Sequence, residues 1–257
     1  MKEQGPVMNP PATDLPARPT LVLLPGLLCD DAVWADQRAA LRARYDLVVG
    51  DYGRLDRIDA MARHMLQTVA APRLLLAGHS MGGRVALEMV RQAPERVAGL
   101  ALLDTGTAPR PAGPAGEEER QGRLALLALA RADGMAAMAR RWAAPMVHPD
   151  VVGTPLFERI VAMVARNDPD RFAAQIEALL HRPDAQPVLQ GLRCPLLLLC
   201  GRQDVWSPPE RHAAMHAAVP GSMLCLVDAS GHMSPMEQPE AVSAALARWA
   251  GVCAHGR

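Results

Sequence analysis

The sequence predicts an α/β fold in which a mostly parallel sheet of about six strands carries helices on both faces. Three observations support this prediction. Short runs of Leu and Val alternate with amphipathic helical patterns along most of the 257 residues. One such run, residues 74–77, leads through a glycine-flanked serine into a helix pattern. A long stretch with helical patterns alone then interrupts the alternation before two further strands.

Each expected strand is a short, nearly uninterrupted apolar run, which is typical of a parallel strand buried on both faces. The six runs are residues 20–24, 46–49, 74–77, 97–103, 195–200 and 223–227. Helix patterns in the core cover residues 32–44, 58–69, 81–93, 208–218 and 239–249. In the second of these helices the apolar residues at helical spacing are Ile58, Met61, Met65 and Val69. That face is expected to pack on the sheet.

The helical stretch is expected to form a separate cap between the fourth and fifth strands. Residues 107–116 are rich in Pro, Gly and Ala, which is typical of a linker. Helical patterns then cover residues 123–132, 135–142, 156–166 and 170–180, with no strand pattern between them. We therefore divide the chain into a flexible N-terminal tail (1–19), a core (20–106 and 191–257) and a helical cap (107–190) inserted in the core.

Composition argues against several classes of protein. The 27 basic and 27 acidic residues give zero net charge, and no basic run suggests nucleic acid or a membrane surface as a partner. Lys2 is the only lysine, and we interpret the arginine excess as compositional bias rather than as function. The five cysteines form no CxxC pair, which favours reduced thiols in a cytoplasmic protein. No apolar run reaches the ~20 residues of a membrane span, and residues 1–19 lack the apolar segment of a signal peptide.

The glycine-flanked serine is the strongest functional signal in the chain. Residues 78–82 read Gly-x-Ser-x-Gly, the pattern of a sharp strand-to-helix turn that holds a serine hydroxyl above the sheet. Gly78 and Gly82 fit because a side chain at either position would collide with neighbouring backbone. The pentapeptide alone also fits an ordinary strand–turn–helix junction. The apolar strand before it and the amphipathic helix after it favour Ser80 as a nucleophile.

Two further residues complete a candidate catalytic triad. Asp204 follows the fifth expected strand and His232 follows the sixth, so both are expected at the sheet edge where Ser80 lies. We predict that His232 acts as the general base and that Asp204 orients it. Asp104 also ends a strand and stays open as an alternative acid. Asp204 is favoured because its strand neighbours that of the histidine.

Two backbone amides form the candidate oxyanion hole. The N–H of Met81 begins the helix after the serine, and the N–H of Leu27 follows Pro25 and Gly26 in the loop after the first strand. Negative charge that develops on a reacting carbonyl needs such donors, and the loss of one costs about 3–4 kcal/mol. Both amides are therefore expected to face the serine.

These motifs together resemble the α/β-hydrolase superfamily over residues 20–250. The matching stretches are residues 24–28, 78–83, 201–204 and 231–233. The sequence looks most like small soluble esterases, including carboxylesterases of pimeloyl carrier-protein esters, enol-lactonases and carbon–carbon bond hydrolases. The resemblance implies the α/β-hydrolase fold, a cap, and roles as nucleophile, acid, base and oxyanion donors for Ser80, Asp204, His232, Leu27 and Met81. The antiparallel pair that often opens this fold is expected to be missing, which leaves six strands.

A substrate pocket is expected where the cap covers the sheet edge. Methionine is common at surfaces that accept varied apolar groups. The candidate pocket residues are Trp34, Met135, Met138, Trp142, Met146, Trp206 and Met233. Ordinary core packing stays an alternative for each of them.

The expected function is hydrolysis of a small carboxylic ester through an acyl-enzyme intermediate. A lactonase, a thioesterase or a carbon–carbon bond hydrolase would use the same triad, since the cap sets the substrate. A lyase or perhydrolase, and a slow-turnover ligand-binding receptor of the same fold, are further alternatives. We expect no cofactor and no metal, because no cluster of His, Cys and Asp has ligand spacing. The expected partner is an ester or lactone substrate, and the chain is expected to be a monomer or homodimer.

Overall fold

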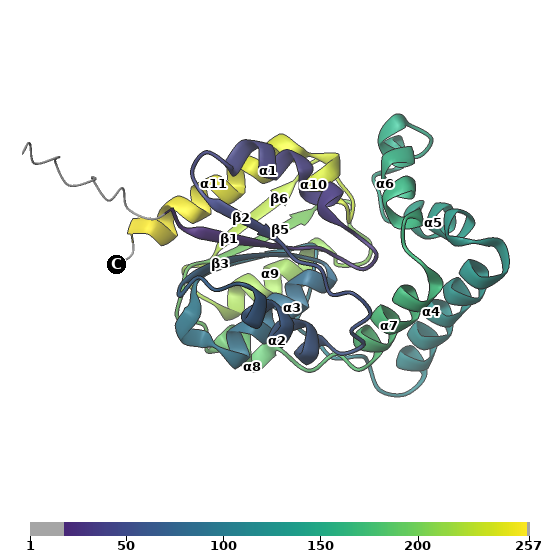
Figure 1. Ribbon diagram of the computed structural model, residues 1–257, viewed down its shortest axis with the longest axis horizontal. Helices are drawn as coiled ribbons and strands as arrows, with labels where there is room; N and C mark the ends of the chain where they lie inside the picture. Colours follow the sequence, from purple (N-terminus) through teal and green to yellow (C-terminus); the bar gives the residue numbers. More distant parts are fainter. Residues whose placement is uncertain (1–17, 256–257) are drawn as a thin grey trace, which may run out of the picture.

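The core of the protein is one sheet whose six strands all run parallel (Figure 1). The computed structural model describes residues 18–255, so the predicted tail lies outside the described residues except for its last two positions. The sheet order is β2-β1-β3-β4-β5-β6. The strands are β1 (Thr20–Leu24), β2 (Asp46–Val49), β3 (Leu74–His79), β4 (Val97–Leu103), β5 (Leu196–Gly201) and β6 (Met223–Val227). The predicted six-stranded sheet is confirmed.

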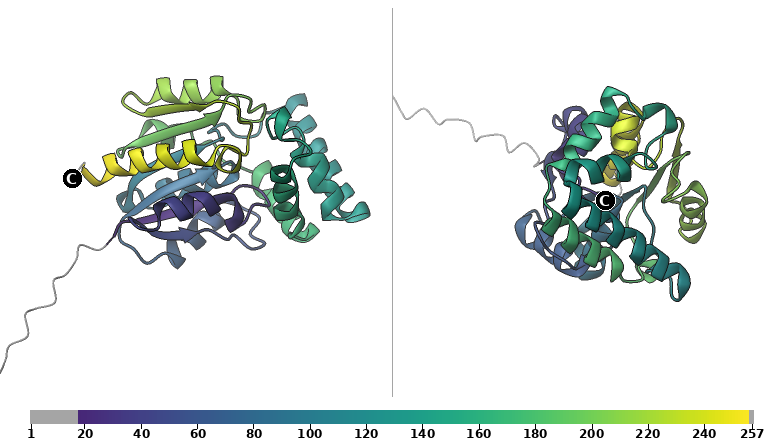
Figure 2. Two further views of the ribbon diagram at one scale, coloured as in Figure 1. Left: turned by 90° about the horizontal axis from the view of Figure 1, so that it is seen from above. Right: turned by 90° about the vertical axis from the view of Figure 1, so that its right-hand side faces the viewer.

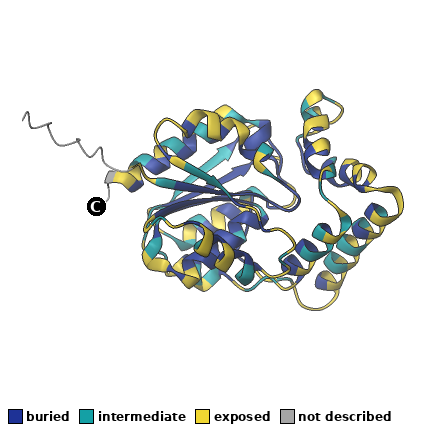
Figure 3. Cartoon of the chain, viewed as in Figure 1, coloured by how far each residue is buried: buried dark blue, intermediate teal, exposed yellow. Residues whose placement is uncertain are grey.

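Helices cover both faces of this sheet (Figure 1). One face carries α1 (Ala35–Leu41) and α11 (Pro239–His255), which pack against each other, and the other carries α2 (Ile58–Thr68), α3 (Met81–Gln92) and α9 (Pro209–Ala218). The central strands are therefore buried on both sides, whereas the edge strands β2 and β6 are only partly buried (Figure 3). This burial explains why the central strands read as continuous Leu-rich runs. No helix among residues 18–255 is both long and apolar enough to cross a membrane.

The first helix is shorter than the predicted range of residues 32–44. A 3-10 turn at Asp31–Trp34 precedes α1, because the Asp30 side chain accepts a backbone N–H inside that tight turn. α1 ends at Leu41, whose carbonyl also accepts the N–H of Tyr45 as the chain turns into β2. Local capping therefore makes the prediction wrong at both ends of this helix.

The chain between β4 and β5 forms helices and no strand. The helices α4 (Pro114–Asp133), α5 (Met135–Ala143), α6 (Pro155–Ala165) and α7 (Pro169–Leu180) make a layer beyond the carboxyl ends of the strands (Figures 1 and 2). α4 begins well before the predicted residue 123, because proline fits the first turn of a helix and Pro114 occupies it. A short helix, α8 (Gln186–Gln190), packs against α3 and α9 of the core.

The carboxyl ends of the strands bring the chemically important residues to one edge of the sheet. Ser80 follows β3, Asp104 follows β4 and Asp204 lies shortly after β5, while His232 lies in the loop after β6. The carboxyl ends of the strands face the cap helices α4 to α7 (Figure 1). This is the edge at which open parallel sheets bind ligands.

Two helical glycines should respond in opposite directions to alanine. A Cβ at Gly82 in α3 would lie 2.0 Å from the carbonyl oxygen of Leu24, so Gly82→Ala forces backbone apart and should cost about 3 kcal/mol of unfolding free energy. A Cβ at Gly122 in α4 meets nothing within 4 Å, so Gly122→Ala should gain about 0.5–1 kcal/mol through helix propensity. Urea denaturation measures both changes. Equal effects at the two positions would contradict the packing argument for Gly82.

Candidate active site

Ser80 sits on a strained turn between β3 and α3. Its φ of 54° and ψ of −116° are unusual for a residue with a side chain. The turn is held by the Ser80 N–H, which donates to the Leu103 carbonyl at 2.9 Å, and by the Thr105 hydroxyl, which donates to the Ser80 carbonyl at 2.7 Å. Gly78 is required in this turn because a Cβ there would lie 2.4 Å from the Gly82 carbonyl oxygen. The backbone strain therefore presents the Ser80 hydroxyl to the space under the cap.

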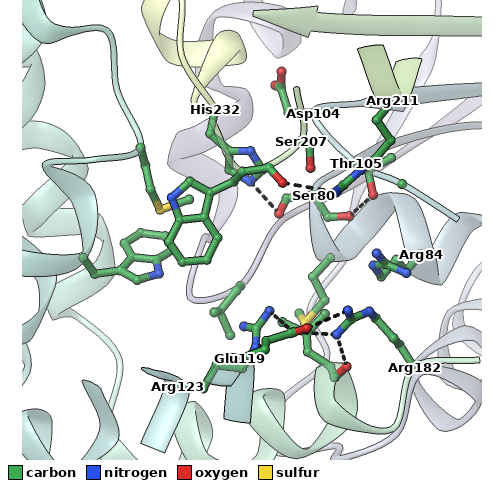
Figure 4. A pocket seen from close by; sticks show the side chains of 17 residues that line it. Ser80, Arg84, Asp104, Thr105, Glu119, Arg123, Arg182, Ser207, Arg211 and His232 are labelled. Carbon is green, nitrogen blue, oxygen red and sulfur yellow. Dashed lines mark hydrogen bonds and ion pairs between the residues drawn. The ribbon is translucent and has the colours of Figure 1, made fainter. Parts of the chain in front are cut away.

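His232 lies between Ser80 and Asp204 (Figure 4 shows the first contact). Its Nε2 is 2.8 Å from Ser80 Oγ, and its Nδ1 is 2.8 Å from Asp204 Oδ2. Asp204 and His232 are almost fully buried. The three side chains come from turns after three different strands, and the structure joins them in one hydrogen-bonded series.

The second oxygen of Asp204 is held by backbone. Asp204 Oδ1 accepts the N–H of Trp206 at 2.8 Å and that of Ser207 at 2.9 Å. Burial acts to raise the pKa of Asp204, but the charge of His232 and the hydrogen bonds from His232, Ser207 and Trp206 outweigh it and lower the pKa. Asp204 is therefore an ionised carboxylate in a fixed orientation.

Asp104, the alternative acid, has different partners. Its carboxylate accepts the N–H of Gly201 at 3.0 Å and the hydroxyl of Ser234. Burial and repulsion from Asp204 raise the pKa of Asp104 well above its usual value. The structure thus brings Asp204 to His232 and holds Asp104 against the neighbouring loops.

The two predicted oxyanion donors border the same cavity as Ser80. Met81 is the first residue of α3, and Leu27 lies in the turn after β1. Within residues 18–255, neither backbone N–H has a hydrogen-bond acceptor. The turn is fixed from the cap side, because Gln175 of α7 accepts the N–H of Leu28 at 2.8 Å. Both donors are therefore free to bind a ligand oxygen.

The cavity over Ser80 has a volume of about 200 Å³ and lies between core and cap. Of the seven predicted pocket residues, Trp142, Met146 and Trp206 line it. An adjoining, more apolar cavity of about 300 Å³ shares Trp142 and Trp206. The remaining four line neither cavity and are buried in packing: Trp34, Met135, Met138 and Met233. The Trp34 ring packs edge-on against His79, with the ring centroids 6.3 Å apart.

Two residues that the sequence reasoning missed hold the loop that carries His232. His79 Nε2 is 2.8 Å from the carbonyl oxygen of His232. Glu237 is buried, and its carboxylate accepts the N–H groups of Gly231, Met233 and His148. The His232 N–H itself donates to the Met146 carbonyl at 2.6 Å. No local pattern marks Glu237, because its partners lie in the histidine loop and in the cap.

One group of side chains has atoms close enough to bind a metal ion. Within residues 18–255 it consists of Asp104, Cys200 and Asp204, whose ligand atoms lie within 4.8 Å of one another. All four carboxylate oxygens already accept protein hydrogen bonds. Burial raises the pKa of the Cys200 thiol, so it stays protonated and is a poor ligand. These residues therefore do not fit a metal centre.

Comparisons with known proteins agree with the fold. A model of the family described as "Alpha/beta hydrolase family" matches residues 21–245. The chain belongs to the alpha/beta hydrolase family. The match spans β1 to α11 and includes the cap.

Several relatives of the chain are hydrolases by name. The chain is 27% identical to "Putative carbamate hydrolase RutD" of Pseudomonas savastanoi pv. phaseolicola over 249 residues, which cover 86% of this chain and 89% of that protein. A thermophilic esterase from Thermogutta terrifontis, solved with malate bound, has a TM-score of 0.78 at 28% identity and 92% coverage of both chains. The enol-lactonase from Burkholderia xenovorans LB400 has a TM-score of 0.78 at 23% identity, covering 91% of this chain and 92% of that one, and it supports the fold alone. The family and these names support a hydrolase.

The buried His79 should make the protein sensitive to acid. Burial, followed by repulsion from His232, lowers the pKa of His79 to about 3, from the usual value of 6.5. Below pH 6.5 the unfolded chain binds a proton that the native state excludes, so stability falls as the pH drops towards 3. This one group should cost about 2 kcal/mol between pH 7 and pH 5. His212, whose pKa burial lowers to about 4, acts in the same direction.

Urea titrations at pH 7 and pH 5 measure this effect. His79→Gln should lose about 2 kcal/mol less than the wild type over this interval. His181→Gln is the control, because His181 is exposed on the cap and its removal should leave the pH dependence unchanged. An identical acid loss in His79→Gln and the wild type would show that His79 does not carry the effect.

Proposed function

We propose that the protein is a serine hydrolase that cleaves a small carboxylic ester through an acyl-enzyme intermediate. The observation that carries the proposal is the pair of 2.8 Å hydrogen bonds that joins Ser80 Oγ to His232 and His232 to Asp204. A nucleophile, a base and an orienting carboxylate in this geometry are what acyl transfer requires. The family and the hydrolase names of relatives support the same reaction class.

In the first half of the reaction, Ser80 Oγ attacks the ester carbonyl while His232 Nε2 takes its proton. Asp204 accepts the Nδ1–H of the imidazole, which fixes the ring tautomer and stabilises the positive charge that forms on it. The oxygen of the tetrahedral intermediate is stabilised by the free N–H groups of Leu27 and Met81. His232 then gives the proton to the departing alkoxide, and the acyl group stays on Ser80.

In the second half of the reaction, water is the nucleophile and Ser80 is the leaving group. His232 takes a proton from water, which attacks the acyl carbonyl, and the second tetrahedral intermediate uses the same amide donors. The proton returns to Ser80 Oγ as the acid leaves. No group other than the substrate and water is consumed.

The size of the cavity favours a small substrate. About 200 Å³ over Ser80 holds a short acyl chain, and the adjoining apolar space of about 300 Å³ beside Trp142 and Trp206 extends the site. A lactone is an internal ester and fits the same steps. A carbamate, which the names of several relatives suggest, would pass through a carbamoyl group on Ser80 and is the second candidate.

Ser80→Ala should abolish turnover of p-nitrophenyl esters. Removal of the nucleophile should lower kcat by roughly 10⁴-fold or more, because only binding and amide donors remain. Ser243→Ala in α11 is the matched control and should retain wild-type activity. Steady-state rates across acetate to decanoate measure both, and the optimum is expected among the short chains.

Retention of activity in Ser80→Ala would contradict the serine mechanism. A burst of one p-nitrophenolate per chain followed by near-zero turnover would instead support the receptor alternative. Turnover of a carbamate but of no ester in the series would favour the second candidate.

Asp204→Asn and Asp104→Asn should differ sharply in rate. Asparagine at position 204 offers His232 an amide in place of a charge and disturbs the ring tautomer, so kcat should fall by roughly 10³–10⁴-fold. Asp104→Asn keeps a carbonyl oxygen for the Gly201 N–H and should lower kcat less than about 10-fold. Matching esterase kinetics with unfolding curves separates catalysis from stability. Equal losses in the two variants would leave no reason to prefer Asp204 as the triad acid.

A further inference from the structure

Arginine dominates the charged lining of the cavity beside Ser80 (Figure 4). Arg84 comes from α3 and Arg211 from α9 of the core, whereas Arg123 on α4 and Arg182 after α7 come from the cap side. Other ionisable groups in the lining are Glu119, Asp104 and His232. The net charge of the whole chain is zero, so the excess of arginine in this cavity is a local feature.

Two of the arginines have a structural partner. Arg182 forms a two-pronged ion pair with Glu119 at 2.6 and 2.8 Å, and Arg123 contacts the same carboxylate at 2.9 Å. Burial acts to raise the pKa of Glu119, but the hydrogen bond from Arg182 and the charges of Arg123 and Arg182 outweigh it and lower the pKa to about 2. These contacts join α4 to the end of α7. Glu119 thus neutralises one of two charges on the cap side.

The other two arginines have no carboxylate partner among the described residues. Arg84 donates from Nη1 to the carbonyl of Ala108 at 2.9 Å, and Arg211 donates to that of Trp206 at 3.1 Å. A guanidinium carries five N–H donors, so most donors of both groups remain available. Asp104 does not serve them, because its oxygens face Gly201 and Ser234.

Burial and the neighbouring arginines make the charged form of Arg84 costly. Burial, followed by repulsion from Arg182, Arg211 and Arg123, lowers the pKa of Arg84 to about 9. Arg84 is still charged at neutral pH. A partly buried cation that is crowded by like charges gains more from an arriving anion than an exposed arginine does.

We propose that Arg84 and Arg211 bind an acidic group, a carboxylate or a phosphate, on the acyl part of the substrate. The proposal rests on the proposed ester hydrolysis at Ser80 and narrows its substrate to an acidic ester.

The position of the arginines indicates that the acidic group belongs to the acyl part of the substrate and not to the leaving alcohol. His232 must stand beside the leaving alcohol to protonate it, and it approaches Ser80 from the side opposite to Arg84 (Figure 4). Arg84, in the first turn of α3, and Ser80 line the same cavity of about 200 Å³. The acidic group therefore lies only a few bonds from the ester carbonyl, as in a half-ester of a short dicarboxylic acid.

Two esters that differ only in charge test the proposal. The acidic probe is monomethyl succinate, and the neutral probe is dimethyl succinate; methanol release measures the hydrolysis of both. The wild type should show a kcat/KM at least about 10-fold higher for the acid. This preference should shrink as NaCl is raised, because salt screens the attraction.

Arg84→Gln and Arg211→Gln should each lower kcat/KM for the acidic probe by about 10–100-fold. The same variants should change kcat/KM for the neutral probe less than about 3-fold, a split that general damage to the fold would not produce. Glutamine retains an amide donor for the carbonyl that each arginine now binds. Arg131→Gln, on the exposed side of α4, is the control and should change neither value. Equal kcat/KM for the two probes in wild type and variants would overturn the proposal.

Titration calorimetry separates the subsite from the catalysis. Ser80→Ala should bind succinate or inorganic phosphate, and Ser80→Ala combined with Arg84→Gln should not. The anion that binds more tightly identifies the acidic group. If the wild type hydrolyses neither probe yet anion binding depends on Arg84, the proposed ester hydrolysis fails and the subsite stands. If neither anion binds, the subsite proposal fails, whatever the esterase activity.

Discussion

The close approach of α3 to the end of β1 is the contact on which the site depends. A Cβ at Gly82 would lie 2.0 Å from the Leu24 carbonyl oxygen, so only glycine lets the helix begin there. The same approach holds Ser80 in its strained conformation and places the N–H of Met81 opposite the turn that contains Leu27. One backbone contact thus sets the positions of both the proposed nucleophile Ser80 and the two free amide donors.

His232, the proposed base, is positioned by contacts from outside β6 and the loop that follows it. β6 is a partly buried edge strand, and the loop after it gains its order from three neighbours. His79 binds the carbonyl of His232, the Met146 carbonyl accepts its N–H, and Glu237 holds the loop on either side. Since Met146 lies in the cap layer, the position of the imidazole and the position of the cap are linked. A movement of the cap would shift Met146 and, through this hydrogen bond, the loop that carries His232.

The order of elements and the local patterns predicted most of the fold and the candidate site. The central strands appear as Leu- and Val-rich runs because both of their faces are covered, and turns after three of the parallel strands place Ser80, Asp204 and His232 at one edge. What the sequence did not predict depends on contacts between distant segments. Glu237 contacts His148 across 89 positions, and Arg182 contacts Glu119 across 63. No local period marks such partners, and four of the seven predicted pocket residues turned out to fill the core or cap.

The arginine cluster shows why overall composition is a poor guide to a site. The chain has zero net charge, yet four arginines line one cavity, and two of them are paired with Glu119. Glu119, Arg123 and Arg182 belong to the cap side of that cavity, while Arg84 and Arg211 belong to the core. An acidic acyl group in this cavity would give Arg84 and Arg211 the anionic partner that they lack among the described residues.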